Sequence, residues 1–392
     1  MRQRKYDRRT RGTAAVAGAL LLALQAATTA LGGPREQAKQ MHDRLAGVPP
    51  SDAVLTQMAA DIAANNAQAA AQIAMSNKNF YNVTLKNFVA PWTSRDRSVF
   101  VPLNDYTATV IGMVRDDVDF STVLSADLLY VSTASGAPLY SAVNNDHYQY
   151  LDDHNVDLKS TLKAATQSGL LGLPVAATAG VMTTRTAAQA FFVAGTNRAM
   201  FRFTMINFMC RDMEQLQDSS LPPDRIRQDV SRSPGGDSRV FLNSCITCHA
   251  GMDPQAQAFA YYNFDATSGR LMYTAGAVQP KYGINTDNFK LGYVTTDDHW
   301  DNYYRHGANQ VLGFDSAMAG SGNGAKSLGQ EWAHSDGFAQ CQVEKVFRTV
   351  CLRDPSNAAD RQTVSDIKVK FKSTGYKMKQ VFADAAIYCM GN

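Results

Sequence analysis

The pentapeptide Cys245-Ile246-Thr247-Cys248-His249 decides how this 392-residue sequence is interpreted. Two cysteines three residues apart, followed at once by a histidine, form the c-type haem attachment motif. One helical turn places both thiols on the same face, where they can meet two vinyl groups of one porphyrin edge as thioethers. The adjacent imidazole then lies under the ring and binds the iron. The motif predicts one covalent haem c held by Cys245 and Cys248, with His249 as an iron ligand.

Three other interpretations of the Cys-x-x-Cys pair are weaker. A thioredoxin-like redox pair belongs in a βαβ setting, and no such pattern surrounds residues 245–248. A zinc site needs four ligands at short spacing, and the sequence has no second Cys-x-x-Cys and no matching pair of histidines. A structural disulfide would leave the following histidine without a role. Haem attachment uses all three side chains.

The N-terminus has the pattern of an export signal. Basic residues lie between positions 2 and 11, and the uncharged, Ala- and Leu-rich run Thr13–Leu31 follows them. Ala30-Leu31-Gly32 offers a cleavage site, whereas the 22 residues of Gly12–Gly33 are also long enough for an uncleaved anchor. We assign residues 1–32 to a signal peptide or signal anchor. The remaining chain is expected in the bacterial periplasm or at the outer face of the inner membrane.

Composition excludes several classes of protein. The chain is 45% hydrophobic and 19% charged, which is typical of a globular protein and not of a disordered or polytopic membrane protein. Six of the basic residues and one acid lie within residues 1–33, so the rest of the chain carries a net charge of −2 although the whole carries +3. A nearly neutral body gives no electrostatic reason to expect nucleic-acid binding.

The four cysteines outside the motif are Cys210, Cys341, Cys351 and Cys389. In an oxidising compartment they favour two disulfides. Cys341 and Cys351 are ten residues apart, roughly 15 Å along a helix, which is too far for a bond within one straight helix. We expect Cys389 to pair with one of these two, and Cys210 to pair with the other or to remain a buried thiol.

Hydrophobic periodicity predicts a mainly α fold with long loops. We divide the chain after the signal into a helical N-terminal domain, residues 33–165, and a haem c-binding domain with a C-terminal helical module, residues 166–392. Ser51, Asn104 and Asp237 are expected to cap helices, the last of them the helix with the haem motif, and Asp253-Pro254 to end or redirect it. Residues 264–285 suggest a short hairpin. Further helices are expected at Arg35–Leu45, Asp52–Met75, Phe120–Tyr130, Arg185–Val193, Asn197–Met213, Asp297–His306, Phe338–Cys351, Asp360–Ser373 and Tyr376–Met390.

A second axial iron ligand is sought downstream of the motif. Methionine there gives a higher-potential electron carrier, histidine a lower-potential one, and an open position allows ligand binding or catalysis. Met318, in a Gly-rich loop that can fold back over the haem, is our first candidate metal ligand. Arg198 and Arg202 are candidates for pairing with haem propionates, although surface ion pairs are the simpler interpretation. The other candidates for the iron are His306, His299, Met272, Met378 and His334.

The region after the motif resembles a known family. CITCHAGMDPQAQAFAYYNFD (residues 245–265) is similar to the C-x-x-C-H-x-x-[ML]-D-P-x-x-x-A-[FL]-x-x-[FY]-D region of the planctomycete-type cytochrome c domain proteins. Asp119–Asp127 and Ala179–Thr183 resemble segments of the same family in the same order, and Cys341–Cys389 its C-terminal helical module. The resemblance covers residues 105–392. The chain departs from the family at Gln255-Ala256, where a glycine commonly follows the Asp-Pro pair.

This resemblance implies an exported, mostly helical protein with a fused monohaem c domain. It assigns haem attachment to Cys245 and Cys248 and proximal ligation to His249, and it supplies no reaction. Motif and resemblance together favour an electron carrier over a catalyst, with a redox protein or membrane complex as its partner and membrane association through the N-terminus. Two alternatives remain open: an enzyme with a five-coordinate haem, and a haem-containing assembly or interaction subunit of an extracytoplasmic complex.

Overall fold

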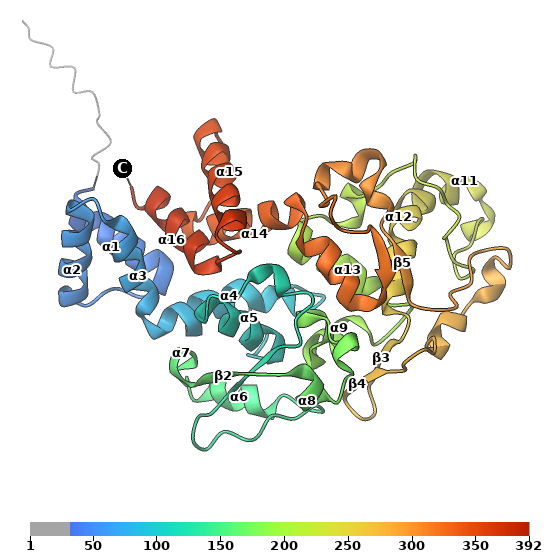
Figure 1. Ribbon diagram of the computed structural model, residues 1–392, viewed down its shortest axis with the longest axis horizontal. Coiled ribbons are helices and arrows are strands. Elements are labelled where there is room, and N and C mark those ends of the chain that lie inside the picture. The colour runs from blue at the N-terminus through green and yellow to red at the C-terminus, as the bar shows by residue number, and fades with distance from the viewer. Residues whose placement is uncertain (1–31, 392) are drawn as a thin grey trace, which may run out of the picture.

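The computed structural model describes residues 32–391. The run that carries the export-signal prediction, residues 1–31, lies outside the described residues. The prediction of a mainly α fold is confirmed, because helices predominate and the strands form three separate two-stranded antiparallel sheets. Figure 1 shows the N-terminal helices at one end of the molecule and the helix with the haem motif at the other.

Three helices open the described chain: α1 (Pro34–Ala46), α2 (Asp52–Ala63) and α3 (Ala67–Ser76). The hydroxyl of Ser51 accepts a hydrogen bond from the amide of Val54 and caps α2, as the sequence indicated. The single helix expected over Asp52–Met75 is in fact two, because Asn65 adopts a left-handed backbone conformation with φ of 58°. Asparagine tolerates this conformation better than most residues, so it ends α2 and lets α3 turn back.

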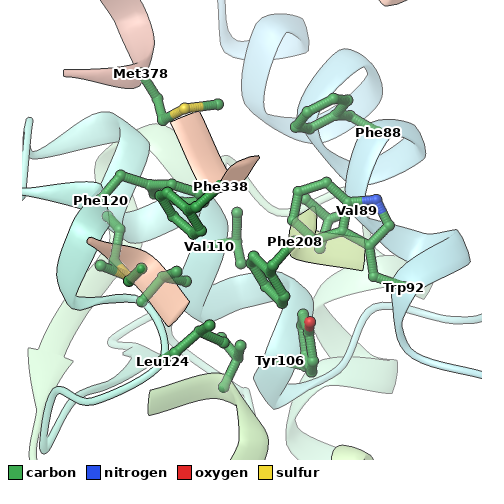
Figure 2. Close-up of a cluster of buried hydrophobic side chains, with 14 of the residues drawn as sticks. Phe88, Val89, Trp92, Tyr106, Val110, Phe120, Leu124, Phe208, Phe338 and Met378 are labelled. Atoms are coloured by element: carbon green, nitrogen blue, oxygen red, sulfur yellow. The ribbon is translucent and has the colours of Figure 1, made fainter. Parts of the chain in front are cut away.

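The middle of the chain packs around α5 (Asp105–Arg115), which Asn104 caps as expected by accepting from the amide of Thr107 at 3.0 Å. Strands β1 (Leu129–Ser132) and β2 (Leu162–Ala165) pair beside it. Figure 2 shows the large aromatic side chains of this core, contributed by segments far apart in sequence. The smaller helices here are α4 (Lys86–Val89), α6 (Asp146–Asp153), α7 (Leu158–Thr161) and α8 (Gln167–Leu171).

The half of the molecule that contains the haem motif is built from short elements. Its helices are α9 (Arg185–Phe191), α10 (Arg198–Thr204), α11 (Ser238–Val240), α12 (Ile246–Ala256) and α13 (Gly324–Ala333). The predicted hairpin is present as β3 (Tyr262–Asp265) paired with β4 (Arg270–Tyr273), and β5 (His299–Asp301) pairs with β6 (Ser321–Asn323). Helix α12 packs against α10 and β5.

The three predicted C-terminal helices are confirmed as α14 (Asp336–Cys351), α15 (Ala358–Ser373) and α16 (Met378–Cys389). Helix α16 packs on α1 and α3, so the two ends of the described chain lie together. One continuous cluster of buried apolar side chains includes residues from both sides of position 165.

Three local predictions are wrong. Residues 120–130 form a single 3₁₀ turn and the start of β1, because they run into an extended segment that pairs with β2. Residues 297–306 contain β5 and a 3₁₀ turn, because pairing with β6 overrides their helical pattern. Helix α12 continues past Pro254 to Ala256. Contacts on both sides of the proline hold the helix: Arg198 binds Asp253, and the side chain of Gln255 bonds to Gly251 and Trp332.

No helix between residues 32 and 391 has the length and apolar character needed to cross a bilayer.

Candidate haem-attachment site

The attachment turn (residues 245–249) lies where two helical segments join. A π-helical segment, Phe241–Cys245, leads directly into α12, and the carboxylate of Asp237 caps the start of this run by accepting from the amide of Arg239 at 2.9 Å. A wide π turn is frequent at functional sites. Because Cys245, Cys248 and His249 are spaced i, i+3 and i+4, they share one face of the helical run.

The two thiols of the attachment turn are unpaired, whereas the other four cysteines form disulfides. Both Cys245 and Cys248 are half-buried, and the thiol of Cys248 donates to the carbonyl of Met213 at 3.6 Å. Burial raises the pKa of the Cys248 thiol. The thiol is therefore protonated near neutral pH, which slows its oxidation because the thiolate is the reactive form.

His249 is held by a carboxylate one turn further along α12. Its Nδ1 lies 3.1 Å from Oδ1 of Asp253, whose side chain is completely buried. An ionised carboxylate only accepts hydrogen bonds, so Nδ1 carries a proton and donates it. In the neutral ring Nε2 is then the nitrogen with a free electron pair. A histidine that donates from one nitrogen to a carboxylate and offers the other to a metal is a common arrangement in metal sites.

Arg198 holds this carboxylate in its charged form. Its guanidinium donates to both oxygens of Asp253, at 2.7 and 2.9 Å, and to both oxygens of Asp229, at 2.7 and 3.0 Å. The amide of Arg227 adds a further bond to Asp253 at 3.3 Å. Burial alone would raise the pKa of Asp253, but the charge of Arg198 and the hydrogen bonds from Arg198 and His249 outweigh it and hold that pKa well below its usual range.

The two arginines singled out in the sequence have different roles. Arg198 does not form a surface ion pair. It lies on α10 and binds Asp253 of α12, whose side chain is buried. Its donors are already used by two aspartates, which leaves it poorly suited to a haem propionate. Arg202 does form the expected surface ion pair, with Asp212 at 2.6 Å.

Exposed apolar side chains lie before the turn, and a buried tyrosine lies behind its helix. Val240 and Leu242 lie three to five residues before Cys245 and remain 44% and 58% exposed. Behind the helix, Tyr304 packs so closely on Gly251 that a Cβ there would lie 2.1 Å from a ring carbon. The buried hydroxyl of Tyr304 has no hydrogen-bond partner within the described residues. Free thiols, an oriented imidazole and exposed apolar side chains together match what covalent haem requires.

No hydrogen bond within residues 32–391 links a candidate second iron ligand to His249. Met318 lies in a bend just after Asp315, and the two residues that follow it, Ala319 and Gly320, line a cavity of 510 Å³. His306 lines the same cavity. Met378 belongs instead to the central core (Figure 2), where its side chain is 1% exposed and cannot reach the turn.

Two other candidate ligands lie on the surface. His299 in β5 and Met272 in β4 are both 42% exposed. His334 ends α13, and its Nδ1 donates to the carbonyl of Gln330 at 2.7 Å. Within the described residues, the side chains of His299, Met272 and His334 form no hydrogen bond with α12.

Sequence reasoning missed the network behind the histidine. The spacing of His249 and Asp253, four residues apart in a helix, was the available signal, but Asp253 was interpreted only as part of a helix-ending Asp-Pro pair. Asp229 and Tyr304 carried no signal, because tertiary packing alone brings Asp229 to Arg198 and Tyr304 to α12. No protein-family model, no curated protein and no solved structure matches the chain.

Proposed function

We propose that this protein is an exported c-type cytochrome with one haem, which exchanges electrons with a redox protein or membrane complex outside the cytoplasm. The observation that carries the proposal is the attachment turn, where two unpaired thiols and one carboxylate-bound imidazole share a helix face. The other four cysteines of the same chain are paired.

Each side chain of the turn has a defined role in this proposal. Cys245 and Cys248 would hold the haem as thioethers, because addition of each S–H bond across a vinyl group would give the sulfur a carbon and the vinyl a hydrogen without any oxidant. Nε2 of His249 supplies an iron ligand. The bound haem supplies a one-electron iron couple, whose potential depends on the axial ligands and on hydrogen bonds to them.

Asp253 is a positioning residue in this proposal. It keeps the proton on Nδ1 of His249 and thereby fixes both the orientation of the ring and the nitrogen offered to iron. Arg198 keeps Asp253 ionised and immobile through two parallel hydrogen bonds. The helix therefore presents an oriented ligand before any haem arrives.

The test of this proposal is export of the chain in a host that matures c-type cytochromes, followed by mass spectrometry and a pyridine haemochrome spectrum. We expect one haem that resists extraction by acidified acetone. The variant Cys245→Ser/Cys248→Ser should lose covalent haem completely. The matched variant Cys351→Ser/Cys389→Ser also removes two cysteines and should keep it. A colourless wild-type protein, or pigment that is extracted from it, would overturn the proposal.

Met318 is our proposed second axial ligand, and this assignment separates an electron carrier from an enzyme with an open iron position. We expect a low-spin spectrum that carbon monoxide does not change. The Met318→Ala variant should become high-spin and bind carbon monoxide. An unchanged spectrum would remove Met318 from the site, and a high-spin wild-type protein would favour the enzyme.

A further inference from the structure

A second site lies apart from the attachment turn, in a hollow of 200 Å³ between α14 and the chain that follows the π-helical segment Met205–Met209. Four cationic side chains line it. They come from three distant parts of the sequence: Arg97 after α4, Arg211 after the π-helical segment, and Lys345 and Arg348 on α14.

Lys345 forms the base of this hollow. Its Nζ donates to the carbonyl of Asn207 at 2.7 Å and lies 3.1 Å from the centroid of the Trp92 ring. The rings of Phe88 and Phe208 lie 5.5 and 5.8 Å from the same nitrogen. The side chain of Lys345 therefore brings a positive charge close to the hollow that it lines. Burial lowers the pKa of Lys345, and the charges of Arg97 and Arg348 lower it further.

The carboxylates nearby do not balance these cations. Asp212 lines the hollow, but its two oxygens accept from Arg202 at 2.6 and 2.7 Å. Arg348 is paired with two carboxylates outside it, Asp354 and Glu344. Within residues 32–391, neither Arg97 nor Arg211 has a carboxylate partner. Positive charge therefore accumulates around one small space.

We propose that this hollow binds a small doubly charged oxoanion of the phosphate or sulfate class. Such an anion fits the volume and offers acceptors on several sides, which guanidinium groups recognise well. Its charge would offset the repulsion between Lys345 and the arginines. The inference does not depend on haem, because no residue of the hollow belongs to the attachment turn.

Inorganic phosphate is the probe. The purified, haem-loaded protein is titrated calorimetrically in a buffer free of phosphate and sulfate, with sodium chloride keeping the ionic strength constant. We expect one phosphate per chain, sulfate competing for the same site, and a rise of the thermal midpoint with phosphate. Arg97→Gln and Arg211→Gln should each weaken binding about tenfold, since each removes a charge-assisted contact. Both side chains are exposed, so both variants should fold.

Two further variants make the test decisive. Arg239→Gln removes a cation that is 81% exposed on α11 and should bind phosphate like the wild type. Lys345→Met should abolish binding while leaving the phosphate-free protein as stable as the wild type or more stable. The proposal is overturned if phosphate binds no better than chloride at equal ionic strength, or if Arg97→Gln and Arg211→Gln leave binding unchanged.

Discussion

The cysteines of α14 and those of the attachment turn differ in their bonding: the former are in disulfides and the latter are free thiols. Helix α14 is tied by Cys341 to Cys210 and by Cys351 to Cys389, with Cα–Cα distances of 5.3 and 5.4 Å. These bonds join positions 131 and 38 residues apart in sequence. Cys245 and Cys248 are only three residues apart and stay unpaired.

This difference shows that closeness in sequence does not decide which cysteines pair. Around α14 the cysteines join separate elements and restrict the unfolded chain. At α12 both thiols lie on one continuous helical run, where a bond between them would add no link between elements. The half with the attachment turn depends instead on buried polar contacts and on close packing.

The largest effect on stability should come from the long disulfide. Chain entropy lost by the unfolded state grows with the closed loop, which gives about 5 kcal/mol for Cys210–Cys341 and about 4 kcal/mol for Cys351–Cys389 as upper values. Urea unfolding should therefore rank Cys210→Ala/Cys341→Ala below Cys351→Ala/Cys389→Ala in free energy of unfolding. Haem content should be unchanged in both. Loss of haem in either would mean that the two regions are not independent.

The sequence predicted the helical class and the C-terminal helices because both depend on local pattern. It also indicated that Cys389 pairs with Cys341 or Cys351, which the structure bears out with Cys351. It failed where contacts between distant segments decide the outcome. Pro254 is a reliable helix breaker in isolation, but the buried bonds of Asp253 and Gln255 outweigh it. Residues 299–301 could not be recognised as a strand without their partner at 321–323.

Close packing behind the attachment turn can be tested at Gly251. In Gly251→Ala the added methyl would overlap the ring of Tyr304, which is fully buried and cannot move freely. Overpacking of this kind costs about 1–3 kcal/mol. Gly283→Ala is the matched control, because no atom lies within 4 Å of its added Cβ. Equal free energies of unfolding for the two variants in urea would show that packing there is looser than described.

The buried polar contacts can be tested at Asp253. Asp253→Asn keeps the size of the side chain and removes its negative charge from the ring of His249. A neutral partner stabilises ferric iron less, so the reduction potential should rise by about 30–60 mV, a change of up to tenfold in the equilibrium. Spectroelectrochemistry measures it. Asp237→Asn, at the exposed start of the same helical run, should leave the potential unchanged. If the two variants had the same reduction potential, Asp253 would have no influence on the iron.

The smallest effect concerns Asp360, beside the Cys351–Cys389 link. This carboxylate accepts from Arg353 before α15, from the amide of Ser356 at 3.0 Å and from the hydroxyl of Tyr388 in α16 at 2.8 Å. The hydrogen bonds from Arg353, with those from Tyr388 and the amides, lower the pKa of Asp360 below its ordinary value. A lowered folded-state pKa adds stability above the unfolded-state value of about 4, and that stability disappears as the pH falls below it.

Asp360→Asn should therefore be less stable than the wild type at pH 7, and the difference should shrink as the pH falls from about 5 toward 3. Urea unfolding across this range measures it. Asp287→Asn, whose side chain is 88% exposed, should show almost no difference at any pH, because exposed ion pairs contribute little. If the difference in free energy of unfolding between wild type and Asp360→Asn stayed constant with pH, the shape of the Asp360 side chain rather than its charge would stabilise the fold.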